Sequence, residues 1–138
     1  PAPGRVAQAD VLLIESTYGN RRHPRDDVQA HLGEIVRATV RRGGSVLLPS
    51  FAVGRAQALL LVVQRLKAAG EIPTDLPLFL DSPMASTATA LYQRHRKLLR
   101  ITPREAATLT DDVTLVAGPE ASERLTRQRW PKVIISAS

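Results

Sequence analysis

The stretch from residue 45 to residue 57, Ser-Val-Leu-Leu-Pro-Ser-Phe-Ala-Val-Gly-Arg-Ala-Gln, decides how this chain folds. It begins with a short apolar run, continues with a turn of small residues, and enters a helix-forming segment that extends to Gly70. A short apolar run is typical of a buried parallel strand. The next apolar run, residues 76–80, follows that helix and would complete a β-α-β unit.

The same alternation continues along the chain. Further apolar runs of strand length lie at residues 11–15, 113–116 and 133–137. Helical patterns occupy residues 28–42, 54–70, 83–92, 103–109 and 119–129. Alternating strands and helices predict an α/β fold with a mostly parallel sheet, right-handed crossovers and helices on both faces. The helix from residue 54 is apolar on nearly all sides, so we expect it to be well buried.

Composition narrows the class of protein. At 138 residues, with 43% hydrophobic residues, the chain fits one globular domain of ordinary size. No apolar stretch approaches the ~20 residues of a membrane-spanning helix, so we expect no membrane partner. The absence of cysteine excludes disulfides and thiolate metal sites and fits a cytoplasmic location. The net charge of +6 favours a polyanionic partner, whereas arginines that merely solvate helix faces are the alternative.

Small polar residues follow the predicted strands, where a parallel sheet usually binds its ligands. These residues are Glu15, Ser50, Ser82, Ser136 and Ser138. A carboxylate at the end of an apolar strand is costly unless it is paired, which makes Glu15 a functional candidate. A structural hydrogen bond to a neighbouring turn is the alternative for Glu15.

The turn around Gly54 is a candidate phosphate site. A helix N-terminus presents free N–H groups and the positive end of the helix dipole. Gly54 would allow close backbone approach, and Arg55 would add a bidentate donor. The turn is neither a Walker loop nor a dinucleotide-binding glycine triplet. A plain strand–helix connection is the alternative.

Nucleophilic catalysis by a serine has weaker support. Neither Ser50 nor Ser82 lies in a Gly-x-Ser-x-Gly elbow, and no histidine is an obvious base. Taken by itself, the segment Asp81-Ser82-Pro83 favours a helix N-cap.

The histidines do not form a zinc motif. His23, His31 and His95 lack the His-x-His or His-x₃-His spacing of metal ligands, so we predict no metal site in this chain. His23 with Asp26 and Asp27 fits a loop and a helix cap better than a metal cluster.

Two stretches are rich in arginine. They are Arg94-His95-Arg96-Lys97 with Arg100, and Arg124, Arg127 and Arg129 beside Trp130. A basic face with an aromatic residue would suit single-stranded nucleic acid. A solvated helix surface is the commoner explanation, and only 4% of the residues are aromatic.

Four motifs in one order carry a family resemblance. They are Glu-Ser-Thr-Tyr-Gly at 15–19, followed by Arg21 or Arg22 and His23; Pro-Ser-Phe-Ala-Val-Gly-Arg-Ala-Gln at 49–57; Asp-Ser-Pro-Met-Ala at 81–85; and Ile-Ile-Ser-Ala-Ser at 134–138. The series resembles the β-CASP branch of the metallo-β-lactamase superfamily. That branch contains zinc-dependent nucleases of RNA, and in some members of DNA, such as ribonuclease J and the endonuclease of pre-mRNA 3′-end cleavage.

The resemblance implies a cap domain inserted in a metallo-β-lactamase core, with RNA entering the cleft between the two. The His-x-His-x-Asp-His cluster that binds zinc in such a core is absent from this sequence. Zinc would therefore be bound by the parent protein, outside this chain. Residues 1–20 would be the end of the core or the seam, and residues 21–138 the β-CASP domain of a longer protein. The run at 11–15 would then belong to the core side and pack poorly here.

The resemblance also implies roles for individual residues. Glu15 matches an acidic motif that supports a downstream active-site histidine, which makes it the catalytic candidate. Ser50, Gly54 and Arg55 match the turn that faces the cleft, and Ser82 and residues 136–138 match other cleft-edge positions.

The expected function is that of a substrate-binding cap domain of a zinc-dependent ribonuclease. This chain would position RNA against its own core domain and would be inactive alone. A stand-alone phosphate- or nucleotide-binding module and a serine hydrolase are the alternatives, and self-association stays open.

Overall fold

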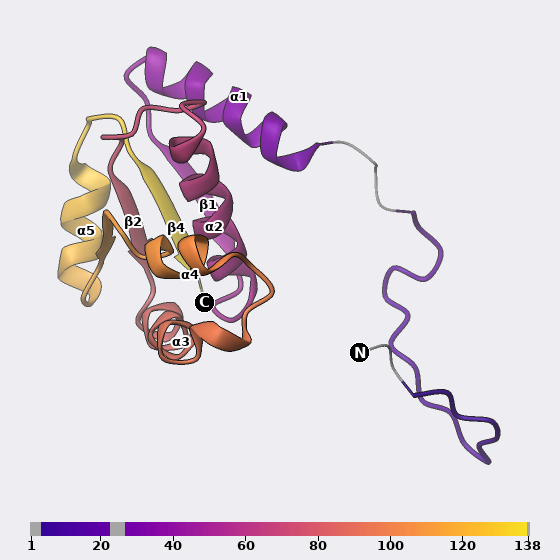
Figure 1. Cartoon of the computed structure of the whole chain (residues 1–138). Coiled ribbons are helices and arrows are strands. Elements are labelled where there is room, and N and C mark those ends of the chain that lie inside the picture. The colour runs from indigo at the N-terminus through magenta and orange to yellow at the C-terminus, as the bar shows by residue number, and fades with distance from the viewer. Residues whose placement is uncertain (1–3, 23–26, 138) are drawn as a thin grey trace.

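A parallel sheet forms the centre of the domain in the computed structural model, which describes residues 4–22 and 27–137. The four strands within these ranges are β1 (Val46–Ser50), β2 (Leu78–Asp81), β3 (Val113–Leu115) and β4 (Val133–Ala137). Their order is β1-β4-β2-β3, and each neighbouring pair is parallel (Figure 1). Strand β4 therefore lies between β1 and β2, so the carboxyl-terminal ends of these three strands share one edge of the sheet.

Helices cover both faces of this sheet, as predicted (Figure 1). They are α1 (Val28–Arg41), α2 (Arg55–Ala68), α3 (Pro83–Arg94), α4 (Pro103–Thr108) and α5 (Pro119–Arg127), with the short 3₁₀ helix η1 (Arg96–Leu98) between α3 and α4. The predicted helices and the strands after residue 45 are present, with ends shifted by a residue or two. The predicted α/β class is confirmed.

Alternation along the strands explains the two layers of helices. Leu78, Leu80 and Ile135 point to one face and are fully buried in the core that α1 and α2 complete. Ile134 points to the other face, where it packs with Leu125 of α5. Successive side chains of a strand alternate between faces, so each strand supplies both cores.

Helix α2 is buried on one side only. Leu60 and Val63 are fully buried, Leu61 is half-buried, and Ala58 is exposed. The predicted burial of this helix is therefore confirmed for the side that carries Leu60 and Val63, and it does not extend to Ala58.

Local signals fix the helix ends. The Asp27 carboxylate accepts a hydrogen bond from the backbone N–H of Ala30 at 3.0 Å, so the predicted aspartate cap of α1 is confirmed. Gly43 adopts a φ of 74° just after this helix, a conformation that suits glycine. His23 and Asp26 lie outside the described residues.

The strand predicted at residues 11–15 is wrong for this chain. These residues have no strand partner among the described residues, and the side chains of the apolar run are exposed, with Leu13 at 93%. Packing is poor here, as the resemblance implied, because no described sheet edge or apolar surface covers the run. Separately, no helix within the described ranges is long and apolar enough to cross a bilayer.

Candidate nucleic-acid interface

The strand register gathers the predicted cleft residues at one edge of the sheet. Ser50 at the end of β1 pairs in register with Ala137 of β4. Ser136 of β4 is in register with Asp81 of β2, which directly precedes Ser82. The carboxyl ends of three neighbouring strands therefore lie side by side, as the sequence predicts. Ser138 lies outside the described residues.

Ser50 and Ser82 differ in accessibility, and Ser136 is half-buried. The hydroxyl of Ser82 is buried, and its oxygen accepts the backbone N–H of Ala85 at 3.1 Å. The helix-cap interpretation of Ser82 is thus confirmed, and its contact with a substrate stays a prediction. Ser50 is half-buried, and its hydroxyl donates to the carbonyl oxygen of Phe51 at 3.4 Å. Ser50 is therefore the more accessible of the two.

Asp81 is already engaged by another element. Its Oδ2 atom accepts a hydrogen bond from the hydroxyl of Ser122 at 2.6 Å, which ties the end of β2 to α5. The carboxylate thus stabilises the packing of α5 on the sheet.

The turn before α2 is held by a side chain to which sequence reasoning gave no role. Gln57 is only 3% exposed, and its Oε1 accepts the backbone N–H of Gly54 at 2.7 Å. Its Nε2 donates to the carbonyl oxygen of Ala52 at 3.1 Å and to Oγ1 of Thr89 at 2.9 Å. The spacing of three residues between Gly54 and Gln57 is that of a capping box, and this signal could have revealed the contact.

The sequence predicts free backbone N–H groups at the N-terminus of α2, but two of these groups are already hydrogen-bonded. The N–H of Gly54 is bound to Gln57, and that of Ala56 donates to the carbonyl oxygen of Phe51 at 3.1 Å. Arg55 is exposed and forms no ion pair with a described residue. The guanidinium of Arg55 is therefore the available anion-binding group of the turn.

A cavity of about 200 Å³ borders this turn. Gly54 and Gln57 form part of its wall, and the rest comes from α2, α3, the connection that follows α3, and Leu109 at the end of α4. Neither Ser50 nor Arg55 lines it. The structure thus places Arg55 beside this cavity without joining it to the serines in one hollow.

Glu15 lies in the exposed N-terminal segment. Its Oε1 atom accepts the backbone N–H of Thr17 at 2.7 Å, and hydrogen bonds from Thr17 hold the pKa of this carboxyl below its ordinary value. This is the turn-bonded carboxylate that the sequence left as an alternative. No described hydrogen bond or ion pair joins Glu15 to the edge that carries Ser50 and Ser136.

The described residues do not supply a zinc site. Within residues 4–22 and 27–137, no three histidine, aspartate or glutamate side chains are grouped so that they could hold a metal ion. The donor set that zinc requires is thus not found in the described part of this chain.

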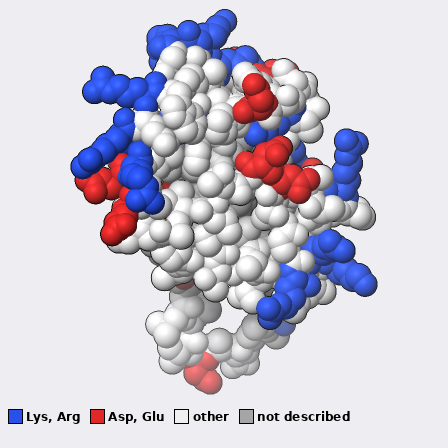
Figure 2. Space-filling model, turned by 90° about the vertical axis from the view of Figure 1, so that its left-hand side faces the viewer, with Lys and Arg blue, Asp and Glu red and all other residues white. Residues whose placement is uncertain are grey.

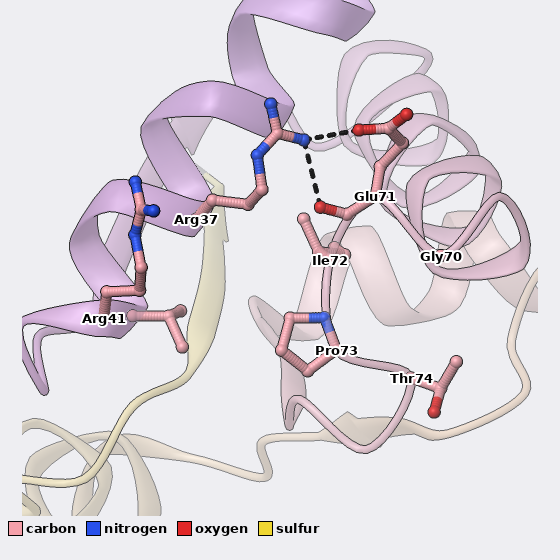
Figure 3. A pocket seen from close by; sticks show the side chains of 8 residues that line it. Arg37, Arg41, Gly70, Glu71, Ile72, Pro73 and Thr74 are labelled. Carbon is pink, nitrogen blue, oxygen red and sulfur yellow. Dashed lines mark hydrogen bonds and ion pairs between the residues drawn. The ribbon is translucent and has the colours of Figure 1, made fainter.

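The largest of the described cavities lies at the opposite edge of the sheet. It has a volume of about 480 Å³ between the last turn of α1 and the loop after α2 (Figure 3). Arg37 spans its mouth and donates to the backbone carbonyl of Glu71 at 3.0 Å and to its carboxylate at 2.6 Å. Helices α1 and α2 both end beside this cavity, whereas α2 begins at the sheet edge that carries Ser50. This cavity is therefore separate from the candidate interface.

The parallel sheet, the braced turn and the accessible arginine define an α/β domain whose carboxyl-terminal sheet edge lies beside an exposed guanidinium. A family model described as the Beta-Casp domain matches residues 56–138, and the chain belongs to this family. The predicted resemblance is thus confirmed.

Relatives agree with the family assignment. Ribonuclease TTHA0252 of Thermus thermophilus is 36% identical over 149 residues, which cover 100% of this chain and 33% of that protein. The RNase J-like protein of Methanocaldococcus jannaschii is 31% identical over 142 residues, covering 100% of this chain and 33% of that protein. The transcription termination factor FttA of Thermococcus kodakarensis is 36% identical over 102 residues, or 72% of this chain and 15% of that protein. The chain thus spans a third or less of these relatives' length.

Proposed function

We propose that this chain is the substrate-binding cap domain of a metal-dependent ribonuclease that cleaves phosphodiester bonds in RNA. The family assignment and the names of relatives, which include ribonucleases, support the class of reaction. The observation that carries the proposal is the shared edge of β1, β4 and β2. Beside this edge α2 presents the guanidinium of Arg55, which forms no ion pair with a described residue.

The role of this chain would be to position the RNA backbone. Arg55 matches the geometry of a phosphate with two parallel N–H donors, and Ser50 offers a hydroxyl at the same edge. Gln57 holds the turn in place, so the guanidinium starts from a fixed helix end. Correct positioning of a substrate lowers a reaction barrier by several kcal/mol.

The remaining parts of the proposal concern the parent protein. Residues 1–20 would belong to its metallo-β-lactamase core or the seam, and residues 21–138 to the cap. Zinc would be held by residues outside this chain, and Glu15 would support an active-site histidine of the core. A cytoplasmic location is supported by the lack of cysteine.

Binding of a short labelled oligouridylate tests the positioning role. Arg55→Gln is expected to lower the affinity of the chain for this RNA about tenfold at low salt, because one phosphate contact is lost. Arg41→Gln removes the same charge from an exposed residue at the opposite edge and is expected to leave the affinity unchanged. Equal losses in both variants would contradict the proposal.

Two further measurements distinguish the alternatives. Addition of zinc to the chain with labelled RNA is expected to give no cleavage, and zinc-dependent turnover would place the chemistry in this chain. Uridine monophosphate is expected to bind far more weakly than the oligomer. Equal affinities would favour the stand-alone nucleotide-binding module instead.

A further inference from the structure

The connection between α3 and α4 carries a large unbalanced positive charge. Its exposed basic residues are Arg94, Arg96, Lys97, Arg100 and Arg104, and residues 94–104 contain no acidic residue. None of these five side chains forms an ion pair with a described residue. The connection therefore offers five cations without internal compensation.

The other basic stretch is different. In α5, Arg127 pairs with Glu123 at 2.5 Å and Arg124 lies 3.9 Å from Glu120, so much of its charge is balanced on the same helix. Figure 2 shows that on the α5 side the basic groups lie mostly around the margin, with acidic groups among them. The solvated-surface explanation suits α5 and not residues 94–104.

The backbone of this connection is held firmly at its far end. Thr102 caps α4 by accepting the backbone N–H of Glu105 at 3.2 Å, and Arg65 of α2 donates to the Glu105 carboxylate at 2.7 Å. Leu99 and Ile101 are half-buried, whereas Arg100 between them is exposed. The cationic side chains therefore extend from an anchored backbone.

The cavity of about 200 Å³ lies between this connection and the turn before α2. Its walls are formed mainly by apolar and aromatic side chains, including Leu61, Tyr92 and Ile101, and Arg100 stands among the lining residues. Cavities for drug-sized ligands have ~300–1,000 Å³, so this one suits a single ring system. An apolar cavity with one tyrosine, Tyr92, and a guanidinium, Arg100, in its lining is suited to an unstacked base.

The cavity adjoins the proposed phosphate contact. Gly54 lines it, and Arg55 is the next residue. In Figure 1 the connection after α3 lies at the same end of the sheet as the C-terminal end of β4. One RNA strand could thus contact Arg55 with a phosphate and reach the cavity with a base.

We propose that residues 94–104 and the adjoining cavity form a second contact surface for single-stranded RNA, in which the basic side chains bind phosphates and the cavity accepts one base. This inference rests on the proposed function and extends it, because residues 94–104 lie outside the four motifs that carry the family resemblance.

Removal of the basic side chains tests whether residues 94–104 bind phosphates. Arg96→Gln/Lys97→Gln/Arg100→Gln is expected to lower oligouridylate affinity at least tenfold and to reduce the log–log salt slope by about 2, or about 0.7 for each lost phosphate contact. Arg124→Gln/Arg127→Gln/Arg129→Gln removes the same charge from the α5 stretch and is expected to have a much smaller effect. A loss of affinity in the α5 variant that equals or exceeds the other would overturn the inference.

A substitution that fills the cavity tests whether the cavity accepts a base. Ala58 lines the cavity from the exposed side of α2, so Ala58→Phe would occupy the space and Ala58→Ser would leave it open. The chain is expected to prefer oligouridylate several-fold over an abasic oligomer of equal length, and only Ala58→Phe should abolish this preference. If the unaltered chain bound the two oligomers equally, the proposal that the cavity accepts a base would be wrong.

The outcomes separate this inference from the proposed function. If Arg55→Gln weakens binding while the triple variant of residues 96, 97 and 100 binds normally, the cap role stands and the second surface is refuted. If the unaltered chain binds no RNA, both fall. Circular dichroism of each variant verifies that the fold is retained.

Discussion

Gln57 of α2 donates a hydrogen bond from Nε2 to Oγ1 of Thr89 in α3 across 2.9 Å. Thr89 in turn donates to the carbonyl oxygen of Ala85 at 2.7 Å, and both side chains are buried. Because the Oε1 atom of Gln57 also accepts the N–H of Gly54, this pair couples the turn beside the candidate interface to the neighbouring helix.

Truncation of Gln57 is expected to destabilise the domain. Gln57→Ala removes the hydrogen bond that Thr89 accepts and leaves the N–H of Gly54 without its acceptor, which costs about 1–3 kcal/mol. Urea unfolding monitored by circular dichroism gives this value. Gln29→Ala, at a half-buried position of α1 whose side chain forms no hydrogen bond with a described residue, is the matched control and should change stability by less than about 0.5 kcal/mol. A Gln57 variant as stable as the control would show that the network contributes nothing.

Gly54 is expected to resist substitution for a backbone reason alone. It adopts φ 81° and ψ −58°, which is strained for other residues, while an added Cβ atom would meet nothing within 4 Å. Gly54→Ala should therefore cost about 1–3 kcal/mol in the free energy of unfolding. Gly4→Ala, in the exposed N-terminal segment where an added Cβ atom also meets nothing within 4 Å, should be nearly neutral. Equal stability of both variants would refute the strain.

Glu105 is expected to make stability depend on acid pH. Its hydrogen bond from Arg65, followed by those from Thr102, lowers its pKa from 4.5 to about 2. A carboxyl whose pKa falls on folding stabilises the native state above its unfolded pKa, and this contribution is lost as pH falls through the folded value. Between pH 4.5 and about 2, the thermal unfolding midpoint of the Glu105→Gln variant should therefore fall less than that of the unaltered chain.

The control for this experiment is Glu120→Gln, because the side chain of Glu120 is fully accessible on α5 and lies 3.9 Å from its partner Arg124. Its acid profile should follow that of the unaltered chain. If the Glu105 and Glu120 variants gave the same profile, the proposed acid dependence would not reside in Glu105.

Lys132 is expected to affect stability at alkaline pH. The residue is 1% exposed, its ammonium donates to the carbonyl oxygens of Gln128 at 2.6 Å and Trp130 at 3.2 Å, and burial lowers its pKa. The unfolded chain then binds more protons as pH approaches the ordinary lysine value, so stability rises with pH in that range. As pH rises through that range, the thermal stability of the unaltered chain should increase relative to that of Lys132→Met. The stability of Lys97→Met should change with pH in the same way as that of the unaltered chain. A gain of the same size against both variants would exclude Lys132 as the cause.

Local patterns predicted most of the secondary structure. The apolar run before Ser50 and the helix caps at Asp27 and Ser82 each depend on neighbours within a few residues, so they can be predicted from the local sequence. Motif order also predicted the family. The run at 11–15 misled the same reasoning, because an apolar run becomes a strand only where another strand supplies hydrogen bonds.

By itself, then, the sequence determined the α/β alternation, the helix ends and the family of this chain. Only the tertiary structure decided that β4 lies between β1 and β2, that Gln57 of α2 is bonded to Thr89 of α3, and that Lys132 is buried. Each of these depends on partners distant in sequence, and a hydrogen bond or a buried charge is stabilising only when such a partner completes it.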